Sequence, residues 1–323
     1  MITVSSICRA LCALLLLAGA SALAQNWPTK PIKFIVPNAA GSSPDLLSRM
    51  WAEKLTRALG QQVLVENNIA GSGLVAAQSA ARSAPDGYTL FLATVVTHAT
   101  NPFMFKSLPY DPVRDFAPIA ILMDDGPFIV AVHPGVPAKT FAEFLALVKS
   151  NPGKFSFAAD AGIAGIAGRW LFKIAGADIV FVPYKQVAAS LQDVVGGRVD
   201  SIIISLAASD AFVKAGKLRL VGVTSARRFA GVEHVPAITE TVPGVQFGGW
   251  FTIAAPAGTP AEIIRRLNHE TGEFLKQPEV DARIRSFGWF SSGAGTPEST
   301  AEFIRAEREK WGRIIREVGI QPE

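Results

Sequence analysis

Cysteine is almost missing from this chain. Among 323 residues only Cys8 and Cys12 are cysteines, and both lie in one apolar segment near the N-terminus. If that segment is removed on export, the mature protein has no thiol. Disulfides, zinc–thiolate sites and cysteine nucleophiles are then excluded.

Histidine is scarce too, and local catalytic motifs are missing. The four histidines, His98, His133, His234 and His269, are far apart, and neither G-x-S-x-G nor H-E-x-x-H occurs. The Gly71–Gly73 turn lacks the lysine and hydroxyl of a phosphate loop. We therefore expect no catalytic residue, no metal and no cofactor. An exported hydrolase stays as the less favoured alternative, because sequence distance alone does not forbid a site.

Charge of one sign is not in large excess. Charged residues make up 18% of the chain and the formal net charge is +4. This balance is too even for a nucleic-acid binder, although a modest positive field helps to collect acids. No nucleic-acid partner is expected.

No apolar run is long enough for a comfortable membrane span. The longest, Leu11–Ala18, follows the single charge of Arg9 and precedes the small residues Ala22-Leu23-Ala24. This pattern is typical of a secretory signal peptide, with an N-terminal anchor as the alternative. We predict a signal peptide over residues 1–24, cleavage near Ala24 and a periplasmic mature chain. Its length, roughly 300 residues, fits two domains of about 150 each.

The chain is organised around a strand, a small-residue loop and a helix start. Phe34–Val36 is a short β run, and Pro44 suits the first helical position with Ser43 as N-cap. The loop Ala39–Ser42 is small enough for a ligand to approach the backbone. Free N–H groups and the helix dipole make such a turn an anion site, although an empty βα turn is the common alternative.

Alternating strands and helices continue through the first half. Val63–Glu66 and Tyr88–Ala93 are the next strands, and short helical connections imply parallel pairing. Ligands bind at the carboxyl ends of such strands. We therefore expect Asn38–Ser43, Gly71–Gly73 and Thr94–His98 to lie on one rim.

A second α/β set follows a change of pattern. Ile119–Met123 and Phe128–Val132 are predicted as two separate β runs, and the later loop Ala159–Gly165 repeats the opening arrangement. Two anion-binding loops, one per domain, could thus face each other across a cleft. The amphipathic helix Pro297–Val318 is expected to be scaffold.

Many short motifs, in order through essentially the whole mature chain, resemble one family. They are Trp27-Pro28-Thr29-Lys30-Pro31-Ile32, Val36-Pro37 with Gly41 and Asp45, Ala84-Pro85-Asp86-Gly87-Tyr88-Thr89-Leu90, Leu108-Pro109-Tyr110-Asp111-Pro112, Asp115-Phe116-Ala117-Pro118, Val182-Pro183-Tyr184-Lys185, Ala215-Gly216-Lys217-Leu218-Arg219, Val223-Thr224-Ser225, Ala255-Pro256-Ala257-Gly258-Thr259-Pro260 and Leu267-Asn268. The chain resembles the Bug (TctC-like) family, the periplasmic solute-binding receptors of tripartite tricarboxylate transporters.

The resemblance implies an α/β, two-domain periplasmic-binding-protein fold, a type II-like Venus flytrap with a ligand cleft between the domains. Domain 1 would comprise residues 25–123 and 250–323, and domain 2 residues 124–249. It also implies a monomer that captures a small organic acid by cleft closure for an inner-membrane permease. A ligand-loaded partner of a membrane sensor kinase is an alternative role for the same fold.

The implied ligand contacts come mainly from the opening loop and the loop of the second domain, through backbone N–H groups and bridging waters. Together with rim residues, the candidate ligand-binding residues are Asn38, Ala39, Ala40, Gly41, Ser42, Ser43, Asp45, Thr94, Thr97, His98, Asp160, Ala161, Gly162, Ile163, Ala164, Arg169, Tyr184 and Ser205.

Departures from the family pattern concern the ligand. Ala39 and Ala40 stand in a loop where relatives carry Phe-Pro-Pro-Gly-Gly, and Ile163 and Ala164 stand where serine and glycine are common. Near Ser205 many relatives carry Asp-Asn, so a partner for a ligand ammonium is missing. The more apolar lining favours an aromatic or dicarboxylic acid over an amino acid.

Single side chains keep two interpretations each. His98 could donate to a carboxylate or be a structural histidine, and Arg169 could hold a second carboxylate or cover the surface. Asp45 is expected to fix the loop or the helix start. Lys185 is expected to be solvated rather than paired with a ligand.

Overall fold

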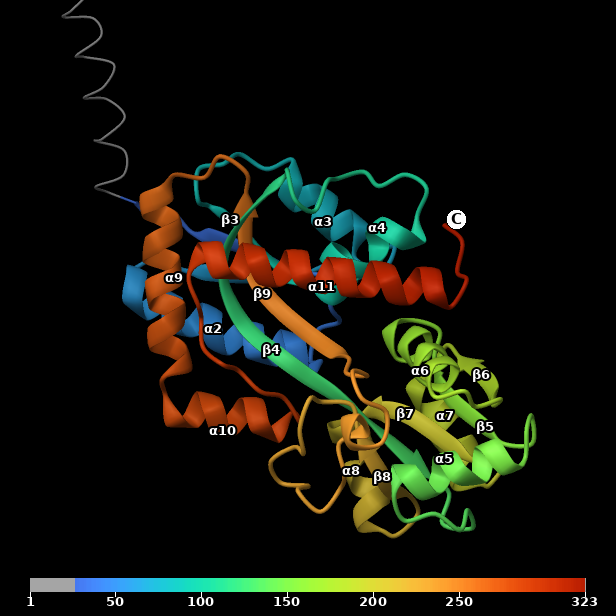
Figure 1. The fold of residues 1–323 in the computed structure, drawn as a ribbon. Coiled ribbons are helices and arrows are strands. Elements are labelled where there is room, and N and C mark those ends of the chain that lie inside the picture. Colours follow the sequence, from blue (N-terminus) through green and yellow to red (C-terminus); the bar gives the residue numbers. More distant parts are fainter. Residues whose placement is uncertain (1–26, 323) are drawn as a thin grey trace, which may run out of the picture.

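The computed structural model describes residues 27–322 (Figure 1). The predicted signal peptide, with its cleavage near Ala24 and both cysteines, lies outside the described residues. Among those described, none of the helices has both the length and the apolar character that a membrane crossing needs.

Strands and helices alternate along most of the chain. The strands are β1 (Ile32–Val36), β2 (Val63–Asn67), β3 (Thr89–Thr94), β4 (Phe116–Val132), β5 (Ser156–Asp160), β6 (Val180–Tyr184), β7 (Ser201–Ser205), β8 (Arg219–Val223) and β9 (Gly248–Pro256). The helices are α2 (Ser43–Leu59), α3 (Leu74–Ala81), the π-helix η1 (Val95–Thr100), α4 (Asn101–Met104), α5 (Phe141–Ser150), α6 (Ile163–Ile174), α7 (Val187–Val195), α8 (Leu206–Lys214), the 3-10 helix η2 (Ile238–Glu240), α9 (Ala261–Leu275), α10 (Pro278–Ser286) and α11 (Pro297–Glu317).

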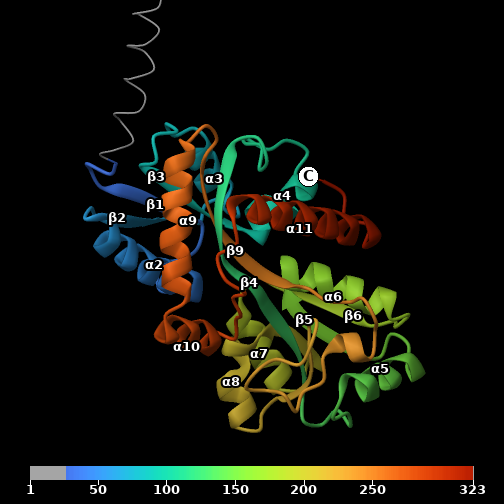
Figure 2. The ribbon, with the colours of Figure 1, turned by 60° about the vertical axis from the view of Figure 1, so that its left-hand side comes forward.

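Nine strands form one continuous, strongly curled sheet. Their order is β2-β1-β3-β9-β4-β7-β5-β6, and β8 pairs β4 on the edge opposite β7. β1, β2 and β3 are parallel, as their short helical connections predict, whereas β9 runs antiparallel to both β3 and β4. Figures 1 and 2 show two lobes joined by β4 and β9.

The two β runs predicted within 119–132 are one strand of 17 residues. The prediction of a break was wrong because the strand bends instead, through register shifts against β9. At Gly126 the two backbones nearly touch: a Cβ on Gly248 would lie 2.7 Å from the Gly126 carbonyl oxygen. The predicted domain boundaries fall inside β4 and β9, and that division remains a prediction.

Apolar side chains cover both faces of the sheet in each lobe. In the first lobe, Phe34 of β1 packs against Trp51 of α2, and both side chains are fully buried. The Trp51 indole N–H donates to the Thr271 hydroxyl at 3.0 Å and so joins these two helices. α9, from the C-terminal part of the chain, therefore packs on the N-terminal lobe.

One core cluster continues from lobe to lobe. It contains Trp250 of β9 and Trp311 of α11 together with Trp170 of α6. The Trp170 indole N–H also donates to the Glu317 carboxylate at 2.6 Å. α11 and α6 therefore hold the two lobes together along one side.

Candidate ligand-binding site

Strand directions decide which sheet edges face each other. β3 and β4 run the same way, because each is antiparallel to β9, and β7 runs back against β4. β5 and β6 follow the direction of β7. The carboxyl edge of the first-lobe strands therefore points toward the second lobe, and that of the second-lobe strands points back toward the first.

The spacing between these edges can be followed along β4. Thr94, the end of β3, pairs with Phe251, which in turn pairs with Met123 of β4. Ser205, the end of β7, pairs with Phe128. Met123 and Phe128 are five residues apart, about 17 Å of extended strand. The two predicted loops belong to opposing edges at this distance.

Asp45 determines the shape of the opening loop. It is 1% exposed. Its Oδ2 accepts from the Gly41 N–H at 2.8 Å and from Arg49 at 2.9 Å, and its Oδ1 accepts from Asn67 at 2.8 Å. Burial raises the pKa of Asp45, but hydrogen bonds from Arg49, Gly41 and Asn67 outweigh it and hold the pKa below its usual range. Asp45 therefore fixes the loop, as expected.

The start of α2 is left open for a ligand. The structure puts the N-cap at Ser42, one residue before the predicted Ser43, and Pro44 is within the first turn. No side chain caps this helix, since the Ser42 hydroxyl donates instead to the Ala39 carbonyl at 2.6 Å. Ala39, Ala40 and Gly41 are exposed. Uncapped N–H groups thus lie beside a small-residue surface.

The three first-lobe segments expected on one rim do converge. A Cβ on Gly73 would lie 2.8 Å from Thr97 Cγ2 and 3.1 Å from Pro37 Cβ. Asn67 ties this rim to the opening loop, because its amide donates to the Asn38 carbonyl at 3.0 Å. The Oδ1 atom of Asn38 is buried and has no hydrogen-bond partner among the described residues.

Side chains of the third rim segment turn inward. Thr94 and Thr97 are buried and cap the π-helix η1 reciprocally. His98 is 1% exposed; its ring stacks against Phe91 at a centroid distance of 5.9 Å and meets Phe116 edge-on at 4.8 Å. These three predicted residues therefore lie in the first-lobe core rather than on the loop surface.

The second-lobe loop repeats the geometry of the first. α6 begins at Ile163 with Gly162 as N-cap, so Ile163 and Ala164 belong to its first turn rather than to a loop. The Asp160 carboxylate accepts from the Gly162 N–H at 2.6 Å. Burial raises the pKa of Asp160. Ala161 and Gly162 are exposed.

Tyr184 and Ser205 lie near Asp160 on the same sheet edge. Asp160 pairs with Tyr184 across β5 and β6, and Ser205 ends the strand on the other side of β5. Burial and the hydrogen bond to Asp193 raise the pKa of Tyr184 to about 12. Ser205 is the N-cap of α8 without a side-chain cap bond.

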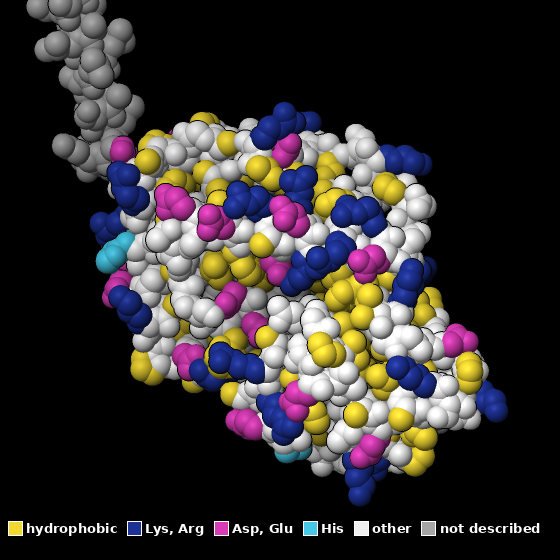
Figure 3. All heavy atoms as spheres, in the orientation of Figure 1, with side chains coloured by type: hydrophobic (Ala, Val, Ile, Leu, Met, Phe, Trp, Pro, Cys, Tyr) yellow, Lys and Arg dark blue, Asp and Glu magenta, His cyan; other side chains and the backbone are white. Residues whose placement is uncertain are grey.

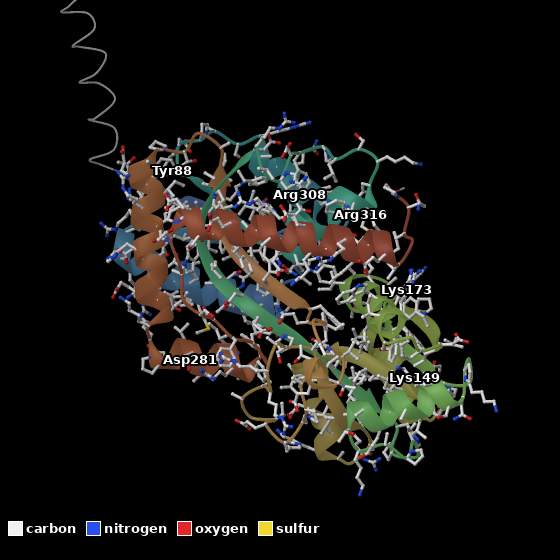
Figure 4. All side chains as sticks on the ribbon, viewed as in Figure 1. Tyr88, Lys149, Lys173, Asp281, Arg308 and Arg316 are labelled. Atoms are coloured by element: carbon white, nitrogen blue, oxygen red, sulfur yellow. The ribbon has the colours of Figure 1, made fainter. Side chains whose placement is uncertain are left out.

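Arg169 lies away from both loops. It is exposed on α6 and donates to the Val318 carbonyl at 3.1 Å, at the C-terminal end of α11. Lys173, labelled in Figure 4, reaches the neighbouring Glu317 carbonyl. The structure thus places Arg169 in the contact between helices, which agrees with the surface alternative.

Sequence reasoning missed Arg49 and Asn67, which hold the opening loop through Asp45. Asn67 follows the predicted strand Val63–Glu66 at the carboxyl edge, so its position alone could have marked it. Within residues 27–322 no group of three or more histidine, cysteine, aspartate or glutamate side chains is arranged to hold a metal ion.

Comparison with known proteins decides the family. The family model described as "Tripartite tricarboxylate transporter family receptor" (TctC) matches residues 47–320. The chain belongs to this family. The resemblance found in the sequence is thereby confirmed, and TctC members are periplasmic solute-binding receptors.

Relatives cover nearly the whole chain. A UPF0065 protein of Bordetella bronchiseptica is 34% identical over 309 residues, which is 96% of this chain and 92% of the relative. The solved structure "R. palustris Rpa4515 with adipate" has 32% identity and a TM-score of 0.79, covering 92% of this chain and 100% of that one. MatC from Rhodopseudomonas palustris with bound malate has 27% identity and a TM-score of 0.71, covering 90% and 100%. The periplasmic-binding-protein fold is confirmed.

Proposed function

We propose that this TctC-family chain is a periplasmic receptor that captures a small organic carboxylate by cleft closure and delivers it to the inner-membrane permease of a tripartite tricarboxylate transporter. The observation that carries the proposal is the pair of uncapped helix starts, α2 and α6, on opposing sheet edges. Each offers backbone N–H donors beside exposed small residues.

Closure of the cleft explains how backbone N–H groups can bind a carboxylate strongly. The proposed domains are residues 25–123 with 250–323, and residues 124–249, and they would approach each other by bending of β4 and β9. When the loops meet around a carboxylate, water leaves and each N–H contact strengthens in the lower dielectric. Affinity and the shape that docks on a permease then arise together.

The substrate class is an aromatic or dicarboxylic acid. Adipate and malate, bound in two similar structures, are both dicarboxylic acids. A loop at each edge suits one carboxylate per lobe, and Ala40 and Ala161 leave room for an apolar body between them. Of the ligand-binding residues proposed from the sequence, those of the two loops serve here through their backbone N–H groups, while Asp45 holds the first loop in shape.

A charge placed in the opening loop tests the site. Ala40 is exposed, so Ala40→Glu should fold normally while its carboxylate competes for the N–H groups of α2. We expect isothermal titration to show loss of adipate or malate binding by at least about tenfold, the effect of one charge-assisted contact. Ala40→Gln has the same size without the charge and should keep most of the affinity.

Equal loss in both Ala40 variants would point to steric blocking, and no loss in either would exclude the opening loop as the site. The same pair at Ala161 tests the second loop. Ligand recovered unchanged after release supports a receptor, whereas a consumed ligand would support the hydrolase. Uptake of the acid that requires both this protein and a permease separates transport from a sensor role.

A further inference from the structure

A second pocket lies inside the first lobe, apart from both loops. It has a volume of about 520 Å³, within the range of small-molecule sites, and it is covered by α11. Its walls are mostly apolar and include Phe103, Phe116 and Ile304, with the exposed side chain of Val113 at the lip. None of the loop residues of the proposed cleft lines it.

His98 gives this pocket an unpaired polar group. The side chain is 1% exposed, and its Nε2 atom is buried without any hydrogen-bond partner among the described residues. An unpaired buried polar atom is costly, so a ligand atom that pairs with it gains affinity.

The neighbouring Thr97 hydroxyl indicates which ring nitrogen of His98 carries the hydrogen. The Thr97 hydroxyl is 3.0 Å from His98 Nδ1 and 3.3 Å from each alternative acceptor on Thr94. We assign its proton to the nearest acceptor, which leaves the ring hydrogen on Nε2 as a donor. Burial, with the charge of Arg308, lowers the pKa of His98 to about 3, so the ring stays neutral.

Arg308 supplies a charge at the same pocket. Figure 4 shows it on the side of α11 toward α3 and α4. Arg305, also in the lining, has Glu302 at 3.8 Å, and Glu309 lies beside them. No hydrogen bond or ion pair within residues 27–322 involves the side chain of Arg308. Figure 3 shows acidic and basic side chains mixed over this face of the molecule, yet the Arg308 guanidinium has no direct partner among the described residues.

We infer that this pocket binds a second ligand, an anion with an apolar body such as a medium-chain or aryl-alkyl monocarboxylate. Its carboxylate pairs with Arg308, its body packs against Phe116 and Ile304, and the N–H of His98 donates to an oxygen of the ligand. This site does not depend on the proposed cleft function, because no loop residue of the cleft is part of it.

The test uses octanoate and 4-phenylbutyrate as probes with the full mature chain. Ala301 is exposed on α11 and lines the pocket, so Ala301→Trp should fill it. Ala306 is exposed on the same helix but is not part of the lining, and Ala306→Trp is the matched control. We expect titration to show loss of octanoate binding only in the first variant.

Charge is tested separately. Arg308→Gln should weaken octanoate binding about tenfold or more, whereas Arg313→Gln, exposed on the same helix, should not. Neither change should alter binding of neutral 1-octanol. Ala40→Glu should also leave octanoate binding unchanged, whatever the cleft binds.

Histidine labelled with ¹⁵N gives a direct readout that does not need a variant. Octanoate should shift the Nε2 signal of His98 and leave those of the other three histidines in place. The proposal is overturned if neither probe binds, if Ala301→Trp binds like Ala306→Trp, or if Ala40→Glu abolishes octanoate binding.

Discussion

At the scale of the residue, Asp45 shows how a carboxylate can serve an anion site without touching the anion. Its two oxygens accept three hydrogen bonds, from Gly41, Arg49 and Asn67. These hydrogen bonds satisfy both carboxylate oxygens and hold the loop in a shape in which Ala39 and Ala40 face solvent.

Asp45→Asn should therefore weaken both the fold and the site. We expect denaturant unfolding to show a loss of about 1–3 kcal/mol, because a buried charged hydrogen bond to Arg49 is replaced by a weaker neutral one. Adipate binding should weaken as well. Asp210→Asn is the control, since its pair with Lys214 is exposed and contributes less than about 0.5 kcal/mol. Equal losses in the two variants would contradict this role of Asp45.

Asp125, in the middle of β4, should make stability depend on pH in the opposite sense to most carboxyls. Burial, together with the charge of Asp124, raises its pKa to about 6, against Lys310 and Arg227. The folded state then holds a proton that the unfolded state has lost between pH 3.8 and 6, so the free energy of unfolding falls as pH rises through this window.

Asp125→Asn removes this contribution to the pH dependence of stability. The free energy of unfolding of the variant, relative to that of the natural chain, should rise as the pH goes from about 4 to about 7.5. The rise should be at most about 3 kcal/mol, the linkage energy of a pKa raised from 3.8 to about 6. Denaturant unfolding at both pH values measures the difference. A difference that is the same at both would show that the Asp125 carboxylate does not titrate in this range.

At the scale of the element, periodic apolar residues predicted most of the structure. The predicted strand Val63–Glu66, for example, is β2, which ends one residue later at Asn67. The sequence analysis did not predict α8, whose apolar residues Leu206, Phe212 and Val213 are only partly buried against the second-lobe core, so that its apolar pattern is weak. The π-helix η1 was missed because mutual capping by Thr94 and Thr97, rather than periodicity, defines its start.

The candidate loops could likewise be located from strand ends, whereas the directions of long side chains could not. His98 points into the core because Phe91 and Phe116 enclose its ring, and Arg169 points to α11 because Val318 lies there. The pocket under α11 joins His98 to Arg308, which are distant in sequence. The last helix, expected to be scaffold, covers this pocket.

Gly73 tests how tightly the rim elements are packed. Gly73→Ala strains a φ of +80° and places a methyl group 2.8 Å from Thr97 Cγ2. Gly176→Ala is the matched control, because its φ is +63° and nothing lies within 4 Å. We expect Gly73→Ala to lose about 1–3 kcal/mol more than the control, the cost of overpacking. Equal losses of stability in the two variants, measured by thermal or denaturant unfolding, would mean that the rim relaxes to accommodate the methyl group.

At the scale of the whole molecule, the strand directions bring the two proposed ligand-binding loops face to face. The chain enters the second lobe along β4 and returns along β9, and β7, β5 and β6 run back toward the first lobe. Two loops that are distant in sequence thereby point at one another. A change of angle in β4 and β9 would move the loops together, with the shared core cluster and the contacts between α6 and α11 on the side that links the lobes.

This motion can be measured with spin labels, because the mature chain is expected to have no cysteine. Ala40→Cys and Ala161→Cys place one label on each exposed loop. A ligand that bridges the lobes should shorten the distance between the labels by several ångströms, as expected for hinge closure. A pair within the first lobe, Ala40→Cys with Glu53→Cys, should not change. If calorimetry shows a bound ligand while the distance between Ala40→Cys and Ala161→Cys stays constant, the ligand binds without closure. The affinity would then come from one loop alone.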